Sequence, residues 1–387
     1  MSGMNKILLA HTDEYGDDPV ACAVVPARFH LLGEHTWFAH GNTLSMAINY
    51  HLTLCASRRQ DSNFKFFSIT LGERRRVSVA NLKYRREDRW TNSLKAILAS
   101  FYAKGYDVPG LNFTVSSDIP SNAGLGTPNA LKVATALVIA KVLGKNFTNE
   151  EILQIVEYAN TEYLNIHPHT ADILCVLESK EGHCIKIDNK HKKATSYPLN
   201  LEGYSIMLTD SHVPRSVVRE ELGARLNECF SAYQTVKKDA EGAKNAKGIS
   251  EAFLKELDIT EATRRRVVYI IRESQSVEDA VEALKRNDRA MLSRIFIRSH
   301  EGLRDRFEIS CPELDWLVKR ALEFIEPIPE NLVCARMTGK GFGGCTYSIL
   351  RTKDIPLYKE KLEEYERIFG FRPRLYSVFP SNGASCV

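Results

Sequence analysis

The chain has 387 residues, of which 44% are hydrophobic and 26% are charged, as in an ordinary soluble globular protein. This length is too great for one small core, so we expect two domains. The 52 Lys and Arg residues against 48 Asp and Glu give a net charge of +4, which is too small to indicate nucleic-acid or membrane binding.

The cysteines indicate a cytoplasmic protein. There are nine, with no C-x-x-C pair, and no secretory signal stands at the N-terminus, so we expect reduced thiols. The longest apolar stretch, residues 133–143, is interrupted by Thr135 and Lys141 and is too short to span a bilayer. We therefore expect no membrane partner.

In the first half of the chain, strand-like and helical patterns alternate. Gly72 marks a turn inside one strand-like run, and Thr148 is a candidate N-cap. The expected strands are residues 21–25, 46–57, 66–79, 111–115, 173–177 and 184–187. The expected helices are residues 90–104, 129–143 and 149–162.

The second half is mostly helical, and a domain boundary is expected near residues 197–202, where a new strand pattern begins. We therefore divide the chain into domains 1–199 and 200–387, both of the α+β class. The expected helices are residues 217–238, 261–274, 277–286, 289–299, 311–323 (closed by Pro327 and Pro329) and 355–369. The expected strands are residues 204–209, 333–337, 345–350 and 374–378.

Three segments carry patterns that indicate a site. Residues 26–42 (P-A-R-F-H-L-L-G-E-H-T-W-F-A-H-G-N) place charged groups beside an apolar strand, where they need partners. Residues 120–132 (P-S-N-A-G-L-G-T-P-N-A-L-K) form a turn from a strand into an apolar helix, which favours a phosphate. Residues 336–346 (R-M-T-G-K-G-F-G-G-C-T) contain four glycines that allow close backbone approach. Each pattern alone is a weak signal, for which tight turns are the common explanation.

Together and in this order, the three segments resemble galactokinases of the GHMP kinase superfamily. The family signature A-P-G-R-V-N-L-I-G-E-H-T-D-Y stands here as V-P-A-R-F-H-L-L-G-E-H-T-W-F, and the phosphate loop P-x-G-A-G-L-S-S-S-A-A-L-E as P-S-N-A-G-L-G-T-P-N-A-L-K. The third motif, R-M-T-G-G-G-F-G-G-C, is nearly intact, and residues 299–318 also resemble galactokinases. The resemblance implies the two-domain GHMP kinase fold, with the site in the cleft between domains.

The resemblance assigns the catalytic pair to Arg28 and Asp172. In the family, these groups flank the anomeric hydroxyl of the sugar. The Asp acts as base or orienter, and the Arg lowers its pKa and stabilises the transferred charge. A structural ion pair between domain elements is the alternative interpretation.

The resemblance assigns the sugar-binding positions to Glu34, His35, Trp37 and His169. Glu34 and His35 are retained, whereas Trp37 replaces a family Asp and His169 replaces a Gly. A family Tyr aligns with Leu222. Because a site built on hydroxyl contacts discriminates strongly, these substitutions predict altered sugar specificity or weak activity.

The nucleotide and phosphate positions are assigned to the second segment and to residues around it. They are Trp90, Gly124, Leu125, Gly126, Thr127, Lys132 and Lys340. The family's Mg²⁺ ligands, a Ser and a Glu, correspond to Pro128 and Asn160, so ATP is expected but no metal ligand is assigned. With Thr127 as N-cap, Pro128 makes a good helix start.

Two groups of basic residues allow other readings. Lys132 replaces a family Glu, and Lys340 lies in the third motif. We expect one or both lysines to supply positive charge in place of the metal ion, or to bind a different anion. Solvent-facing lysines are the alternative. The histidines His30, His35 and His40, and the pair His167 and His169, lack the spacing typical of zinc ligands.

Three functions therefore remain open. The first is ATP-dependent phosphoryl transfer to the anomeric hydroxyl of galactose or a related sugar. The second is a catalytically inactive galactokinase-like protein that senses or binds a sugar, a nucleotide or a protein partner. The third is a non-enzymatic metal-binding or scaffold role. The retained catalytic pair favours the first function, and the substitutions at the sugar and metal positions favour the second.

Overall fold

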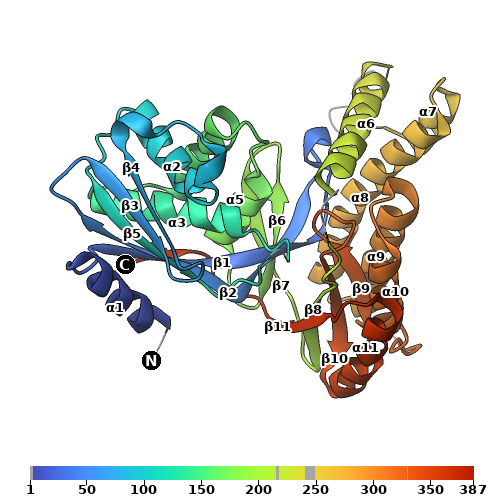
Figure 1. Ribbon diagram of the computed structural model, residues 1–387. Helices are drawn as coiled ribbons and strands as arrows, with labels where there is room; N and C mark the ends of the chain where they lie inside the picture. The colour runs from blue at the N-terminus through green and yellow to red at the C-terminus, as the bar shows by residue number, and fades with distance from the viewer. Residues whose placement is uncertain (1–2, 122, 215–217, 240–248, 329) are drawn as a thin grey trace.

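The computed structural model describes residues 3–121, 123–214, 218–239, 249–328 and 330–387. Three residues named in the sequence predictions lie outside these ranges: Asn122 in the glycine-rich turn, Val217 at a helix start and Pro329 at a helix end. The chain forms two lobes, and each is a β-sheet with helices packed against it (Figure 1). This is the mixed helix–strand composition that the sequence predicted.

The first lobe is built on an eight-stranded sheet. Its main path is β12-β1-β2-β5-β3-β4, with β6 paired to β2 and β7 paired to β6. The β3–β5 pair is parallel, and the other pairs named here are antiparallel. The strands are β1 (Ala21–Leu32), β2 (Thr43–Arg58), β3 (Asn63–Ser68), β4 (Glu73–Ser78), β5 (Leu111–Ser117), β6 (His183–Asp188), β7 (Lys193–Pro198) and β12 (Ser385–Cys386).

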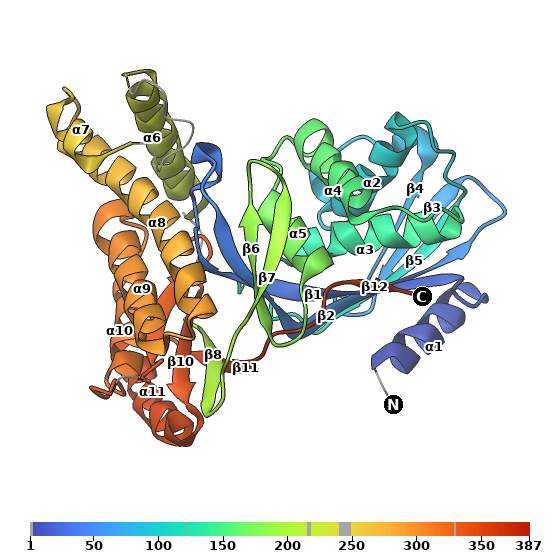
Figure 2. The ribbon, with the colours of Figure 1, turned by 180° about the vertical axis from the view of Figure 1, so that it is seen from behind.

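Helices cover both faces of this sheet. Four lie together on one face in Figures 1 and 2: α2 (Thr91–Ala103), α3 (Thr127–Val142), α4 (Asn149–Tyr158) and α5 (Thr170–Glu178). On the opposite face lies α1 (Gly3–Tyr15), which contacts β5 and β2. Helix α3 is buried along most of its length because it packs between the sheet and α2, α4 and α5. It therefore holds the preceding glycine-rich turn in a fixed place.

The second lobe has a four-stranded antiparallel sheet in the order β11-β8-β10-β9. Its strands are β8 (Tyr204–Asp210), β9 (Cys334–Thr338), β10 (Cys345–Arg351) and β11 (Arg374–Val378). Its helices are α6 (Val218–Asp239), α7 (Glu251–Glu256), α8 (Glu261–Lys285), α9 (Arg289–Glu301), α10 (Pro312–Leu322) and α11 (Ile355–Phe369). Helices α6 and α7 project beyond the rest of the lobe (Figure 1). No helix within the described ranges has the length and apolar character needed to cross a bilayer.

The end of the chain returns to the first lobe. In β12, Cys386 lies opposite Ala23 of β1, and Figure 2 shows the C-terminus beside α1. The proposed division at residues 199 and 200 falls between β7 and β8. We keep this division into domains 1–199 and 200–387 as a proposal. Residues 385–386 would belong to the second domain by this division, but they pair with the sheet of the first lobe.

Four expected elements differ from the structure. Residues 173–177 lie in helix α5 instead of a strand, since a short buried apolar run fits either element. The expected helices 261–274 and 277–286 are one helix, α8, because Ser274 and Ser276 bond back to carbonyls one turn earlier and do not break it. Strand β1 extends past residue 25 to Leu32.

The expectation that every cysteine is reduced is wrong. Cys22 and Cys55 lie opposite each other in the antiparallel β1–β2 pair, with Cα atoms 4.1 Å apart, and form a disulfide. The register that brings them together cannot be read from a separation of 33 residues in the sequence. The other seven cysteines, all within the described ranges, are thiols.

Candidate active site

The glycine-rich turn wraps around Arg28 of β1. The Arg28 backbone N–H donates to the Leu125 carbonyl and its Nη1 to the Gly124 carbonyl, both at 3.0 Å. Gly126 has φ +84°, and a Cβ there would lie 3.2 Å from the guanidinium carbon of Arg28. Only glycine combines this backbone conformation with so close a neighbour, so the turn and Arg28 fit together as a unit.

Arg28 holds Asp172, in the first turn of α5, through a bidentate ion pair. Nε lies 2.7 Å from Oδ1 and Nη2 lies 2.7 Å from Oδ2, and both side chains are buried. Burial by itself would raise the pKa of Asp172, but Arg28, with hydrogen bonds from His169 and His30, holds it well below its ordinary value. The structure thus brings the predicted catalytic pair together, with Asp172 as a carboxylate.

Asp172 also faces three further side chains. Asn129 Nδ2 donates to Oδ2 at 2.7 Å, His30 Nε2 lies 3.0 Å from Oδ1, and His169 Nδ1 lies 3.5 Å from Oδ2. Because His30 Nδ1 lies 2.7 Å from the Ser45 hydroxyl, from which it can accept, a proton on Nε2 can be donated to Asp172. Protein donors therefore surround both carboxylate oxygens.

Sequence reasoning did not assign His30 and Asn129 to the site. His30 follows Arg28 by two residues, so the two share one face of β1, and this spacing could have identified it. Asn129 lies at the start of an otherwise apolar helix, and its Oδ1 is buried without a hydrogen-bond partner among the described residues. An amide in this position points to a polar neighbour, but the sequence does not say which one.

Trp37, His167 and His169 form an aromatic stack that ends at Asp172. The Trp37 and His167 rings lie 4.6 Å apart at 14°, and the His167 and His169 rings 3.7 Å apart at 34°. Burial, and then the neighbouring His169, lowers the pKa of His167 to about 3, so the ring is neutral near pH 7. Trp37 is 39% exposed. The two substituted sugar positions are thus linked through His167, a residue that sequence reasoning weighed only as a metal ligand.

Glu34 and His35 lie where the two lobes meet. Glu34 Oε1 accepts a hydrogen bond from the Gly339 N–H at 2.6 Å, and Oε2 pairs with Arg336. Burial opposes ionisation of Glu34, but Arg336 lowers its pKa. His35 Nε2 lies 3.2 Å from the Gly339 carbonyl, the ring stacks on Phe307, and burial lowers its pKa to about 4. These contacts join the first motif to the third.

Helix α3 begins one residue before the start predicted with Thr127 as N-cap, and two residues before the predicted range 129–143. Gly126 is the N-cap and Thr127 the first helical residue, with Pro128 in the first turn. The reason is the left-handed conformation at Gly126, whose carbonyl accepts from the N–H groups of Asn129 and Ala130. No described group accepts from the Gly126 and Thr127 N–H groups, which leaves them available to an anion.

Lys132 is 1% exposed and lies against Asn160. Its Nζ donates to Asn160 Oδ1, while Asn160 Nδ2 donates to the Pro168 carbonyl at 2.7 Å. Asn160 belongs to the π-helical turn Ala159–Tyr163 that follows α4. Burial lowers the pKa of Lys132 to about 8, and the negative charge of Asp172 opposes this effect. The alternative interpretation, in which Lys132 faces solvent, is therefore wrong.

The remaining predicted residues have different surroundings. Trp90 precedes α2, and its indole N–H donates to Glu73 at 3.0 Å. Lys340 is exposed and lies close enough to the aromatic stack to help lower the pKa of His167. Leu222 is buried in the core of the second lobe. Among the described residues, no group of three or more His, Cys, Asp or Glu could hold a metal ion.

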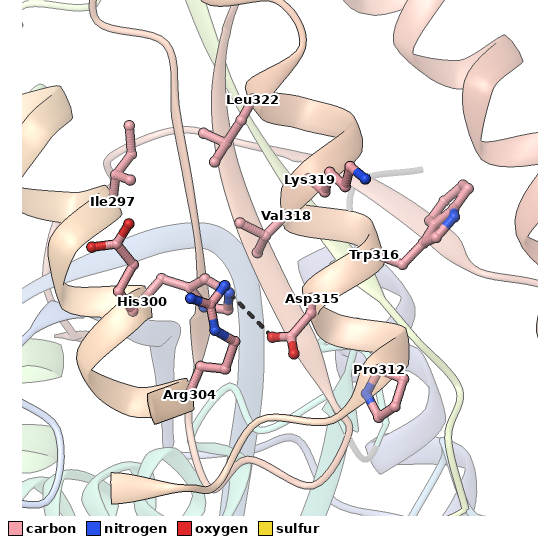
Figure 3. A pocket seen from close by; sticks show the side chains of 10 residues that line it. Ile297, His300, Arg304, Pro312, Asp315, Trp316, Val318, Lys319 and Leu322 are labelled. Atoms are coloured by element: carbon pink, nitrogen blue, oxygen red, sulfur yellow. Dashed lines mark ion pairs between the residues drawn. The ribbon is translucent and has the colours of Figure 1, made fainter. Parts of the chain in front are cut away.

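A pocket of about 430 Å³ lies between α9 and α10 (Figure 3). On its wall, His300 Nε2 is 3.3 Å from Asp315 Oδ1, and His300 Nδ1 accepts from the Met337 N–H of β9. None of the candidate site residues lines this pocket. The candidate site is therefore defined by the contacts around Asp172 and not by this cavity.

Three family descriptions match the chain. They are "Galactokinase galactose-binding signature" at residues 9–58, "GHMP kinases N terminal domain" at 92–179 and "GHMP kinases C terminal" at 280–365. A "Putative galactokinase" of Treponema pallidum (strain Nichols) is 56% identical over 99% of this chain and 97% of that protein. The chain belongs to the galactokinase family.

Two other galactokinases agree with this assignment. The galactokinase of Thermotoga maritima is 31% identical over 92% of this chain and 97% of that protein. The crystal structure of Lactococcus lactis galactokinase complexed with galactose has a TM-score of 0.90 over 99% of both chains, at 21% identity. The predicted two-domain GHMP kinase fold is thereby confirmed.

Kinases of this superfamily use ATP and Mg²⁺, but the corresponding metal positions here do not fit Mg²⁺. Pro128 has no side-chain oxygen, and the Asn160 oxygen already accepts from the Lys132 ammonium. Mg²⁺ prefers carboxylate and phosphate oxygens, and an adjacent ammonium repels a dication. The residues at these two positions therefore do not form a Mg²⁺ site.

Proposed function

We propose that this protein is an ATP-dependent sugar kinase that phosphorylates the anomeric hydroxyl of galactose or a related sugar. The buried Arg28–Asp172 pair beside the glycine-rich turn is the observation that carries the proposal. It places a carboxylate acceptor and a guanidinium next to a helix N-terminus suited to phosphate. Galactose is the sugar named for the matched signature and for the Lactococcus complex.

In the proposed reaction, Asp172 orients the sugar hydroxyl and Arg28 stabilises negative charge on the transferred group. A carboxylate whose pKa is held low is a weak base, so positioning is its main contribution. This is sufficient for phosphoryl transfer, since its loose transition state depends mostly on alignment and charge stabilisation. The Gly126 and Thr127 N–H groups would bind the phosphates of ATP.

We propose further that the aromatic stack alters sugar specificity or weakens activity toward galactose. Trp37 offers a ring face where the family has a carboxylate, so it can pack against the apolar face of a sugar ring but cannot accept from a hydroxyl. A hydroxyl left without an acceptor on binding is penalised by about 1–3 kcal/mol. A related sugar that lacks a hydroxyl facing Trp37 avoids this penalty.

A catalytically inactive protein that binds a sugar or nucleotide is the second candidate. It is favoured by the donors that already surround Asp172, from Arg28, His30, Asn129 and His169. A sugar hydroxyl would have to displace one of them before Asp172 could accept its proton. A sensor of this kind would pass the signal to a protein partner.

A phosphotransfer assay over a panel of sugars distinguishes the two candidates. We expect the wild-type protein to phosphorylate at least one sugar, and Asp172→Asn to reduce its kcat/KM at least 100-fold. The exposed Asp17→Asn serves as the control and should leave the rate unchanged. Binding of a sugar or ATP without turnover of any sugar would support the inactive candidate and contradict the kinase.

A further inference from the structure

We propose that the Lys132 ammonium takes the place of the metal ion in this protein, so that it binds ATP without Mg²⁺. The inference rests on the proposed function as an ATP-dependent kinase. It starts from the observation that Pro128 and Asn160, which stand at the family's metal positions, do not suit Mg²⁺.

The first argument is the position of the ammonium. Lys132 follows Pro128 by four residues in α3, so the two lie on the same helical face. Side chains on a helix lean toward its N-terminus, which carries the Lys132 chain toward Pro128 and the phosphate turn. Because Nζ contacts Asn160 Oδ1, the ammonium lies at one family metal position, on the helical face that carries the other.

The second argument is that the Lys132 ammonium has fewer hydrogen-bond acceptors than donors. A lysine ammonium has three N–H donors, and Asn160 Oδ1 is its one hydrogen-bond acceptor among the described residues. The nearby carboxylate of Asp172 is already paired with Arg28. A buried ammonium is costly unless anionic or polar groups satisfy it. Phosphate oxygens that enter beside the turn would satisfy the other two donors.

The third argument is the balance of charge. The family places carboxylates at the positions of Lys132 and Asn160, and this chain has an ammonium and a neutral amide instead. The loss of two carboxylates removes the negative charge that attracts a metal ion. The gained ammonium supplies positive charge for the nucleotide phosphates, as lysines do in other phosphate sites.

The test is calorimetric titration of the full-length protein with ATP, once in excess EDTA and once in MgCl₂. We expect the two dissociation constants to agree within about fivefold. Binding that requires MgCl₂ would overturn this inference and leave the kinase proposal standing. The absence of ATP binding in both buffers would overturn both.

Variants assign the effect to Lys132. Lys132→Met should weaken ATP binding in EDTA at least tenfold, whereas Lys141→Met, an exposed lysine of the same helix, should not. Unchanged binding by a folded Lys132→Met would overturn the inference. The double variant Lys132→Glu with Asn160→Glu restores the two carboxylates that the family has at these positions. We expect it to lose binding in EDTA and regain it in MgCl₂, and metal-free binding by this variant would also contradict the inference.

Discussion

Gly126 and Gly124 show how one turn can require glycine for two different reasons. Both have positive φ, +84° and +81°. A Cβ at Gly124 would meet nothing within 4 Å, whereas a Cβ at Gly126 would press on the Arg28 guanidinium. The left-handed backbone makes glycine favourable for stability at both positions, but only at Gly126 would an added side chain press on Arg28 of the candidate catalytic pair.

Alanine at these two glycines is a matched test of that coupling. Both Gly126→Ala and Gly124→Ala should lower the free energy of unfolding by about 1–2 kcal/mol, because alanine resists the left-handed conformation. Gly126→Ala should also reduce kcat/KM by at least tenfold more than Gly124→Ala does, since only its Cβ would displace Arg28. Urea unfolding and the phosphotransfer assay measure the two effects. Equal activity of the two variants would contradict the coupling.

Trp37→Asp tests the origin of the proposed specificity. The variant restores the family's carboxylate at the end of the aromatic stack, so it should raise kcat/KM for galactose at least tenfold relative to other sugars of the panel. Trp37→Phe keeps an aromatic ring and is the control, for which we expect no such change. A galactose preference unchanged by Trp37→Asp would mean that the stack does not determine specificity.

At the scale of elements, long periodic segments were predictable and local pairings were not. Helix α3 and strand β5 follow from their patterns, because burial on a regular element leaves a periodic signal. The apolar run 173–177 was misassigned because a short run carries no usable period. Helix α1 was not predicted at all.

In the candidate site too, some residues could be predicted from the sequence and others could not. Arg28 and Asp172 were found because both lie in motifs that resemble the family. The spacing of His30 from Arg28 could have identified it, but its pairing with Asp172 joins residues distant in sequence. The same is true of the Asn129 contact with Asp172 and of the stacking of His167 on Trp37. Such contacts depend on strand register and helix packing, which a single sequence does not display.

Helix α1 provides a pH-dependent prediction. His11 is fully buried against the sheet, with Nδ1 2.8 Å from the Thr114 hydroxyl of β5, and burial lowers its pKa to about 4. The unfolded chain, with a His pKa near 6.5, then binds more protons than the folded chain between pH 6.5 and 4. Stability should therefore fall as the pH falls through this window, by up to about 3 kcal/mol.

Urea unfolding at a series of pH values measures this loss. His11→Asn does not titrate in this range, so the variant should lose less stability between pH 6.5 and 4 than the wild-type protein. His191, which is exposed, gives the control variant His191→Asn, with the wild-type pH profile. Identical profiles for the wild type and His11→Asn would contradict the role of His11.

At the scale of the whole molecule, the lobes are joined at the site by a buried ionic network. Arg336 of β9 is fully buried between Glu34, which follows β1, and Glu273 of α8, at 2.9 Å from Glu273 Oε1. Glu273 Oε1 also accepts from the Gly33 N–H at 2.7 Å. The first and third motifs thus belong to one buried junction, although some 300 residues separate them in sequence.

Removal of the cation at this junction should destabilise the protein. Arg336→Met leaves two buried carboxylates without their cationic partner, for which we expect a loss of about 3–5 kcal/mol in the free energy of unfolding. Arg298→Met, on the exposed side of α9, should change it by less than about 0.5 kcal/mol. Thermal or urea unfolding compares the two, and similar small losses would show that the network does not hold the lobes together.

The central claim is that this protein transfers phosphate from ATP to the anomeric oxygen of a sugar. The most direct measurement is ³¹P NMR of the products after incubation with ATP and galactose, and then with each sugar of the panel. The account predicts ADP and a sugar 1-phosphate for the wild-type protein with at least one sugar, and neither above background for Asp172→Asn. Failure of the folded wild-type protein to form a sugar 1-phosphate from any sugar would contradict the account.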